Sequence, residues 1–171
     1  VSTRANNAGT DTQVVEITVT GSNDAPVAKE ASFSVNEDGE LIGSLDAVDL
    51  DDGDTINIEI AAGGDPASGA VEILVPDNDN PKFRFKYTPN ADFFGTDSFE
   101  FRVEDSFGAT STAKINLDIT PVNDAPVAQA DAATVKEGET TTVEVLKNDL
   151  DIEGDLLSIN SVSTSKLGDV S

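Results

Sequence analysis

The sequence Asn-Asp-Ala-Pro-Val-Ala occurs at residues 23–28 and again, letter for letter, at residues 123–128. The spacing (123 − 23 = 100 residues) is about the length of one small β-sandwich domain. Each copy follows a stretch of alternating apolar and polar residues, at 12–20 and at 112–120, which is typical of a final strand. Proline stiffens the joint because its ring fixes φ and its nitrogen cannot donate to a sheet. We therefore interpret each copy as a rigid linker between consecutive domains.

The repeat divides the 171 residues into three parts. We expect residues 1–22 to be the C-terminal strands of a preceding repeat, residues 23–122 to be one complete domain, and residues 123–171 to be the N-terminal part of a following repeat. Because both ends fall inside repeats, we also expect the sequence to be a segment of a longer protein, with partial repeats that fold incompletely.

Seven strand signals separated by turn residues fill the complete domain. They lie near residues 32–35, 40–47, 55–61, 71–75, 82–87, 98–103 and 112–120. Seven short strands in about 100 residues predict an all-β fold of tandem Greek-key sandwiches. Aromatic side chains are concentrated in the fifth and sixth strands, and we predict that they form the core.

The composition limits the possible functions. With 33 acidic and 10 basic residues the net charge is −23, which excludes nucleic acid as a natural partner. Cysteine and histidine are absent, so thiolate and imidazole metal sites and Ser-His-Asp or Cys-His catalysis are excluded within this chain. No stretch approaches the roughly 18 apolar residues of a membrane span. The many carboxylates suit a hard cation, above all calcium.

Strand parity predicts where these carboxylates gather. If hairpins connect successive strands, the turns after the second and sixth strands lie at the end of the domain where the linker enters. The turn Asp-Leu-Asp-Asp-Gly-Asp at 49–54 is one of these, and Asp105 lies in the other. We therefore expect Asp49, Asp51 and Asp105 to meet Asn23 and Asp24.

The turns after the first and fifth strands are expected at the other end, beside the outgoing linker. The first strand ends at Glu37, and the following repeat adds its own acidic turn. The candidate ligands at this second junction are Glu37, Asp97, Asn123, Asp124, Asp149 and Asp151, with Glu137 repeating Glu37 in the following repeat.

Electrostatics favours a cation at such a junction. Two carboxylates about 5 Å apart repel by roughly 3 kcal/mol at an effective dielectric constant of 20. Several of them would splay the joint, whereas calcium takes six to eight oxygen ligands. The plainer alternative is a solvated acidic turn, since Asp, Asn and Gly favour turns in any case. The return of the same residue types after 100 positions, beside the linker, favours the metal site.

Several motifs together resemble a known family. They are Val-Asn-Glu-Asp at 35–38, Asp-x-Asp-x-Gly-Asp at 49–54, Tyr-Thr-Pro-Asn-Ala-Asp-Phe-Phe-Gly at 87–95 and the two linkers. In this order they resemble the cadherin-like tandem repeats of large bacterial surface adhesins. The first fragment, which ends Val-Thr-Gly-Ser-Asn-Asp-Ala-Pro-Val at 19–27, is similar to the related VCBS repeats.

This resemblance implies cadherin-like or immunoglobulin-like sandwiches joined end to end and stiffened by calcium. It further implies an extracellular location at the cell surface, in the extender region of an RTX adhesin, where the segment provides spacing in cell adhesion or biofilm formation. The expected partners are then neighbouring repeats of the same chain and calcium. A cell-surface or matrix ligand would be bound through other domains.

Two alternatives compete with this interpretation. A module that binds carbohydrate or another protein would need an exposed platform, yet tryptophan is absent and the lone Tyr87 is expected to point inward. An enzyme could use paired carboxylates for glycoside hydrolysis. The carboxylates are expected at turns shared between domains, away from any evident cleft, so we expect no enzyme.

Overall fold

The structure, a computed structural model, describes residues 14–16, 21–51, 53–78 and 82–163. This part of the chain contains strands and turns but no helix. The strands are β1 (Val27–Ala28), β2 (Ala31–Asn36), β3 (Leu41–Ser44), β4 (Ala47–Val48), β5 (Asn57–Ile60), β6 (Gly69–Leu74), β7 (Arg84–Pro89), β8 (Gly95–Glu104) and β9 (Thr110–Thr120).

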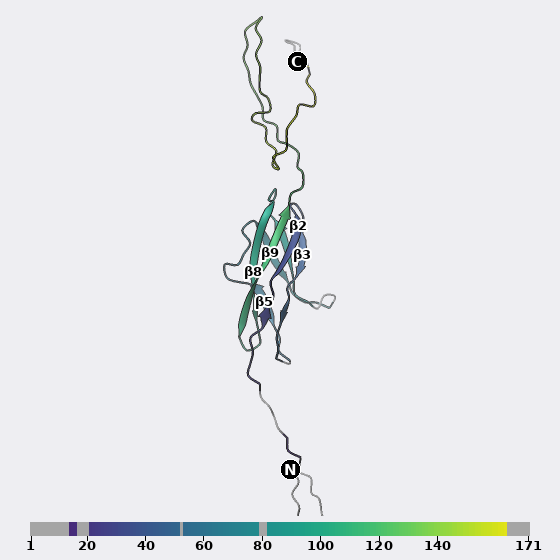
Figure 1. Ribbon diagram of the computed structural model, residues 1–171, viewed down its shortest axis with the longest axis vertical. Coiled ribbons are helices and arrows are strands. Elements are labelled where there is room, and N and C mark those ends of the chain that lie inside the picture. Colours follow the sequence, from purple (N-terminus) through teal and green to yellow (C-terminus); the bar gives the residue numbers. More distant parts are fainter. Residues whose placement is uncertain (1–13, 17–20, 52, 79–81, 164–171) are drawn as a thin grey trace, which may run out of the picture.

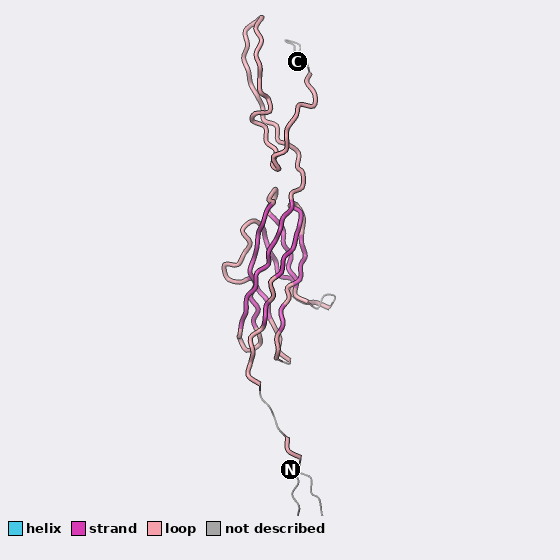
Figure 2. The backbone as a smooth tube through the Cα atoms, in the orientation of Figure 1, coloured by secondary structure: helices cyan, strands magenta, loops and turns pink. Residues whose placement is uncertain are grey.

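Two sheets face each other in a sandwich (Figures 1 and 2). One has the order β2-β9-β8-β5 and the other the order β3-β7-β6, while β1 and β4 form a separate short pair. The seven longer strands fall where the alternating pattern predicts them, so the all-β prediction is confirmed. The predicted strand at 40–47 is divided into β3 and β4, because the chain leaves β7 and pairs with β1 instead.

The first and last long strands run in the same direction. β2 pairs with β9 in parallel, from Ala31 opposite Ile115 to Asn36 opposite Thr120, whereas the other sheet neighbours are antiparallel. Both strands therefore end at the same end of the sandwich, and the backbone N–H of Glu37 donates to the carbonyl oxygen of Thr120 at 2.9 Å. The pairing places Glu37 beside the outgoing linker.

The core lies between the sheets and is rich in aromatic rings. Phe85 and Tyr87 of β7 are buried, as are Phe99 and Phe101 of β8, which confirms the aromatic core predicted from the sequence. The ring of Phe85 makes edge contacts with Phe99, at a centroid distance of 4.9 Å, and with Phe33 at 5.2 Å. Burying each such side chain contributes about 1.5–3 kcal/mol, so these rings anchor the sandwich.

The following repeat forms turns rather than sheets. Between residues 123 and 163 the structure has one bridge, Val127 with Leu150, and no regular strand. Apolar side chains there, such as Val135 and Ile159, are about half exposed because no partner strands cover them. This segment lies beyond one end of the sandwich, and the incoming chain reaches the other (Figure 1). Most of the strand predicted at 12–20 lies outside the described residues.

Candidate metal centres at the two ends of the domain

We call the end of the sandwich where the linker at 23–28 enters the incoming end. Here Asp105 follows β8 and organises a tight turn, since one of its carboxylate oxygens accepts the N–H groups of Phe107 (2.8 Å) and Ala109 (2.9 Å). Its other oxygen accepts the side-chain amide of Asn23 at 2.8 Å. This bond from Asn23 is the largest cause of the lowered pKa of Asp105; burial opposes it and the backbone donors of the turn add to it.

The turn at 49–54 lies beside the turn at 105–109. One carboxylate oxygen from each of Asp49, Asp51 and Asp54 lies within 4.8 Å of the others. Asp51 accepts the backbone N–H of Asp24 at 2.7 Å, and the hydroxyl of Ser106 donates to Asp54 at 2.9 Å. The structure thus brings both halves of the predicted incoming junction together around the linker.

We call the opposite end, formed by the turn at 36–39 and the segment at 120–124 that leads from β9 into the second linker, the outgoing end. Glu37 is fully buried there, and its Oε1 accepts the backbone N–H of Val122 at 2.6 Å. One carboxylate oxygen from each of Glu37, Asp124 and Glu153 lies within 4.8 Å of the others. Asp124 also donates its backbone N–H to Glu153 Oε2 at 3.1 Å.

The outgoing cluster has carboxylate oxygens in excess of donors. Glu37 Oε2, Asp124 Oδ2 and Glu153 Oε1 are buried and have no hydrogen-bond partner among the described residues. The pKa of Asp124 is raised, first by burial and then by the negative charges of Glu153, Asp38, Asp92 and Glu37. Buried polar atoms without a protein partner are rare in folded proteins, and an ordered water or an ion usually satisfies those that occur.

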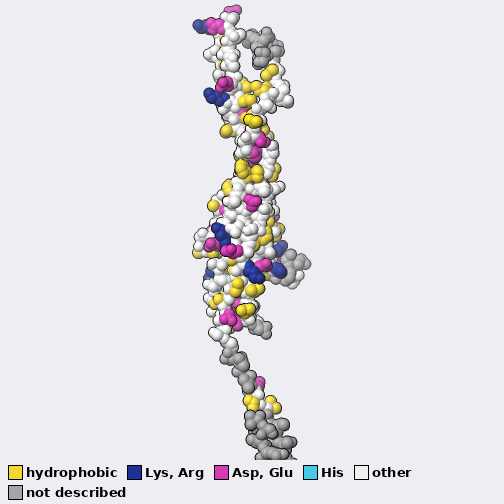
Figure 3. Space-filling model, viewed as in Figure 1, with side chains coloured by type: hydrophobic (Ala, Val, Ile, Leu, Met, Phe, Trp, Pro, Cys, Tyr) yellow, Lys and Arg dark blue, Asp and Glu magenta, His cyan; other side chains and the backbone are white. Residues whose placement is uncertain are grey.

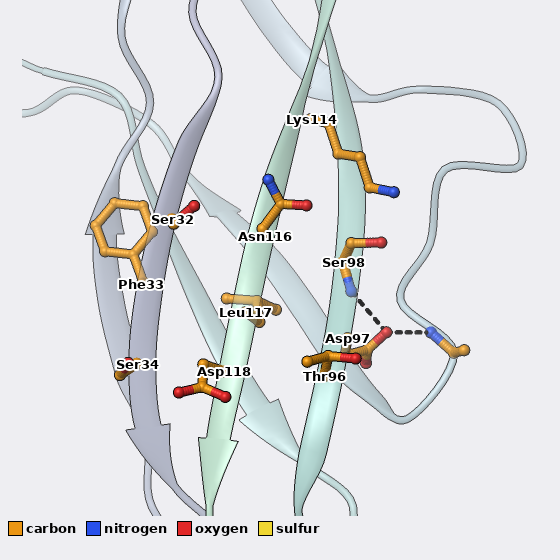
Figure 4. Close-up of a pocket in the computed structure, with 11 residues that line it drawn as sticks. Ser32, Phe33, Ser34, Thr96, Asp97, Ser98, Lys114, Asn116, Leu117 and Asp118 are labelled. Carbon is orange, nitrogen blue, oxygen red and sulfur yellow. Dashed lines mark hydrogen bonds between the residues drawn. The ribbon is translucent and has the colours of Figure 1, made fainter.

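Asp97 does not lie at the outgoing junction, and this part of the prediction is wrong. β8 begins at Gly95, so Asp97 is inside the strand rather than in the turn before it. Its carboxylate accepts the backbone N–H groups of Ala67 (3.0 Å) and Ser68 (2.9 Å) and the hydroxyl of Tyr87 (2.9 Å); Figure 4 shows it pointing toward this loop. Burial favours a raised pKa for Asp97, but these donors outweigh it and lower the pKa.

The remaining candidates belong to the following repeat or the linker. Asn123 donates its side-chain amide to the carbonyl oxygen of Asp124 at 2.8 Å, and with Asp124, Asp149 and Asp151 it lines a hollow of about 380 Å³. Asp149 accepts the backbone N–H of Gln129 at 2.7 Å, and Asp151 that of Asp155 at 2.9 Å. Glu137 is exposed in the turn around Gly138 and joins neither of the two acidic clusters of the described residues.

Two residues of these clusters were not among the predicted ligands. Asp54 ends the motif Asp-x-Asp-x-Gly-Asp, and its position in that motif is the signal that could have identified it. Glu153 was missed because the corresponding turn, Asp-Leu-Asp-Ile-Glu-Gly-Asp at 149–155, is one residue longer than the first, so a constant offset of 100 places Glu153 opposite Gly53. Alignment on Gly53 and Gly154, which both have positive φ, instead places Glu153 opposite the acidic residue Asp52 of the first turn.

The donor set of both ends fits calcium. All the clustered side-chain ligand atoms are carboxylate oxygens, which calcium prefers, and a buried glutamate supplies one of them. Backbone carbonyls and water could complete six to eight ligands. The residues present therefore fit a hard divalent cation at the incoming and outgoing ends.

A hollow on the outer face of β2, β9 and β8 differs from the two acidic clusters in its lining (Figure 4). This hollow of about 600 Å³ is lined mainly by serine, threonine, asparagine, lysine and aspartate side chains. Phe33, the aromatic residue in its lining, makes an edge contact with Phe85 of the core. The hollow therefore lacks a stacking surface for a sugar ring.

Within the described residues no helix is long and apolar enough to span a bilayer. On the face shown in Figure 3, acidic side chains are spread along the length of the molecule rather than gathered into a single patch. The two acidic clusters at the ends of the domain therefore arise from the positions of the acidic turns and not from the overall negative charge.

Comparison with known proteins places this architecture in a family. A family described as bacterial Ig domain matches residues 23–118 and again residues 123–171. Integrin beta-like protein A of Dictyostelium discoideum is 30% identical over 145 residues, which is 76% of this chain and 7% of that protein. Integrin beta-like protein C of the same organism is 28% identical over 165 residues, which is 86% of this chain and 8% of that protein.

This chain therefore spans less than a tenth of the length of the curated relatives it matches. Among solved structures, an endo-fucoidan hydrolase from glycoside hydrolase family 107 superposes with a TM-score of 0.45 and 20% identity, covering 61% of this chain and 15% of that one. A likeness this low carries no argument about function. The two matched ranges, together with the sandwich of residues 27–120, show that the chain belongs to the bacterial immunoglobulin-like domain family.

Proposed function

We propose that this chain is a calcium-stiffened extender segment of a bacterial cell-surface adhesin, built from repeats of the cadherin-like or VCBS type. Its role is spacing in cell adhesion or biofilm formation, as in the extender region of RTX adhesins. Domains of this family are usually extracellular, and the curated relatives carry the name integrin beta-like. Both points support an adhesion module outside the cell.

The observation that carries the proposal is the buried Glu37 carboxylate at the outgoing end. Glu37 belongs to the complete domain, whereas Asp124 and Glu153 belong to the linker and the following repeat. A calcium ion held by these three side chains would neutralise their charges and link the two repeats. At the incoming end, Asp49, Asp51 and Asp54 would hold calcium beside the linker in the same way.

Calcium binding to the folded chain would add stability by mass action. Extracellular calcium modules have dissociation constants of about 0.1–1 mM. Calcium at ten times such a value adds about 1.4 kcal/mol per site. The segment would then be stiff in the calcium of an extracellular medium and flexible where calcium is scarce. Its partners are calcium and the neighbouring repeats, with a cell-surface or matrix ligand bound by other domains.

Neither alternative function has a comparable observation in its favour. Bacterial Ig-like domains are typically not catalytic, and the carboxylate clusters of the described residues lie at turns at the two ends of the domain. A carbohydrate-binding or protein-binding module would have to use the polar hollow on the β2, β9 and β8 face, which offers no exposed ring. We therefore assign the segment a structural role.

Small-angle X-ray scattering of the whole chain tests the proposal. In millimolar calcium we expect a narrow, elongated pair-distance distribution and a raised melting temperature, and in chelator a broader distribution and a lower melting temperature. Magnesium at the same concentration is the control, because it prefers a smaller octahedral site and keeps its waters. Superimposable scattering and melting curves in calcium and in chelator would contradict the proposal.

A further inference from the structure

Partly exposed apolar side chains lie beside the acidic cluster of the outgoing end. Phe94 ends the loop between β7 and β8, and this loop lies next to the end of β9 because Gly95 pairs with Ile119. Val122 follows β9 and is fixed at the same end by its backbone N–H bond to Glu37. Phe94 and Val122 are each 39% exposed. We call these two side chains the apolar rim of the outgoing end.

The turn of the following repeat that reaches this end also carries an apolar residue. Asp124 donates its backbone N–H to Glu153 at 3.1 Å, and a carboxylate oxygen of Glu153 lies within 4.8 Å of one of Glu37. Ile152 directly precedes Glu153 and is 49% exposed. Figure 3 shows hydrophobic side chains on both sides of the junction between the sandwich and the following repeat. The hydrogen bond from Asp124 therefore holds the neighbour of Ile152 at the outgoing end.

Ile152 has no counterpart in the turn of the complete domain. When the two turns are aligned on Gly53 and Gly154, the residues before Ile152 keep their match with Asp-Leu-Asp at 49–51, and Glu153 falls opposite an aspartate. The insertion is thus a single apolar residue in a mainly acidic turn. Single exposed apolar residues are common on protein surfaces. Here they occur on both sides of one junction, so closing that junction would remove them from water together.

We propose that Phe94 and Val122 form the docking surface for Ile152 of the following repeat, and that this apolar contact helps to close the outgoing junction around calcium. The inference rests on the proposed function and adds to it a second force, the burial of apolar surface. Such a contact would also keep water from the neighbouring carboxylates, and a lower dielectric strengthens their attraction for a cation. Glu37 Oε2 and Glu153 Oε1 are already buried, which supports this role.

Distance measurements between paired spin labels follow this junction in the full chain. The sequence contains no cysteine, so labels attach only to introduced cysteines. T96C in β8 and N148C in the following repeat are both exposed and lie on opposite sides of the junction. The width of the distance distribution is measured in chelator and during titration with calcium to about 5 mM, well above the expected dissociation constant.

The variants are F94S, I152S and the two combined. Ile152 lies outside the sandwich, so I152S does not put the fold of the domain at risk. The matched controls are F107S at the incoming end and I159S, which makes the same change in the following repeat but outside the turn at 149–155; Phe107 and Ile159 are 74% and 54% exposed.

We expect F94S and I152S each to broaden the distribution in chelator. Each should also raise the calcium concentration at which the distribution narrows by about three- to tenfold, the effect of leaving part of a large apolar side chain in water. Because the two side chains contact each other in the closed junction, the double variant should shift this concentration no further than the larger single change. Both controls should match the unmodified chain.

The remaining outcomes separate the contact from the proposed function. If calcium narrows the distribution but the variants behave as their controls, the proposed function stands and the apolar contact is wrong. If the effects of F94S and I152S simply add, the two side chains do not contact each other and the inference fails. If calcium leaves the unmodified chain unchanged, the proposed function fails; broadening by I152S in chelator would then still support the contact, and equal widths would refute both.

Discussion

The buried carboxylate of Glu37 and the carboxylate of Asp124 approach within 4.8 Å across the boundary between the sandwich and the following repeat. The two residues are 87 positions apart in the sequence (124 − 37 = 87), and the parallel pairing of β2 with β9 brings them together. Glu37, which follows β2, therefore lies beside the end of β9, where the linker leaves the sandwich.

Replacement of Glu37 by glutamine should weaken calcium binding at the outgoing end. The amide keeps the size of the side chain and an oxygen that can accept from Val122, but it removes the charge that attracts the cation. We expect at least about a tenfold loss of affinity at that site by calorimetry, because changing even an outer-shell partner of a metal ligand typically costs about 10–100-fold. In chelator, E37Q should be at least as stable as the unmodified chain, because one of the facing negative charges has been removed.

E30Q provides the control for this change, because Glu30 is exposed and lies away from both acidic clusters of the described residues. Its calcium affinity should match that of the unmodified chain. Equal affinities of E37Q and E30Q would show that the buried carboxylate does not bind the ion.

Asp97 should make stability depend on acid pH. Burial alone would raise the pKa of Asp97. The backbone N–H groups of Ser68, Ala67 and Ser98 and the Tyr87 hydroxyl donate to its carboxylate and hold the pKa below its ordinary value of 3.8. A lowered pKa in the folded state means that the stabilisation is present above pH 3.8 and is lost as the pH falls through the folded-state pKa.

D97N should therefore flatten the melting temperature against pH in the acid range and cost about 2 kcal/mol at neutral pH, the usual loss for hydrogen bonds to a charged group. D65N, in the exposed loop that precedes the same contacts, is the control and should retain the acid dependence. Identical pH profiles for D97N and the unmodified chain in chelator would refute the assignment.

Phe85 should be the most sensitive position of the core. It is fully buried between Phe33 and Phe99, so F85A removes both ring contacts and leaves a cavity. Such truncations cost about 3–5 kcal/mol. F107A is the control, since Phe107 is 74% exposed and its loss should change stability by less than about 0.5 kcal/mol. Urea unfolding compares the two, and a similar loss in both would contradict the packing described.

Gly43 should tolerate no side chain, because a Cβ atom there would lie 2.3 Å from the ring of Phe85. G43A should force the ring or the backbone of β3 to move, at a cost of about 1–3 kcal/mol. At Gly21, just before the incoming linker, an added Cβ would meet no described atom within 4 Å, so G21A should be neutral or slightly stabilising. Thermal melting of both variants in chelator checks this, and a neutral G43A would show that the two sheets are less tightly packed at β3.

The strands and the aromatic core could be predicted from the sequence because alternation and turn residues are local signals. The convergence of Asp49, Asp51 and Asp105 on the linker followed from strand direction alone, which hairpin topology fixes. Asp97 could not be placed, because whether β8 begins at Gly95 or after Asp97 depends on its pairing with β9 and on donors from the loop at Ala67 and Ser68. Glu153 was hidden by the single inserted residue, and only the tertiary structure brings it to Glu37.

The most direct test is a crystal structure of the whole chain grown in millimolar calcium. The account predicts an ion at the outgoing end, at about 2.3–2.6 Å from carboxylate oxygens of Glu37, Asp124 and Glu153. Carboxylates of these three residues turned into water, with no ion between them at that calcium concentration, would contradict it.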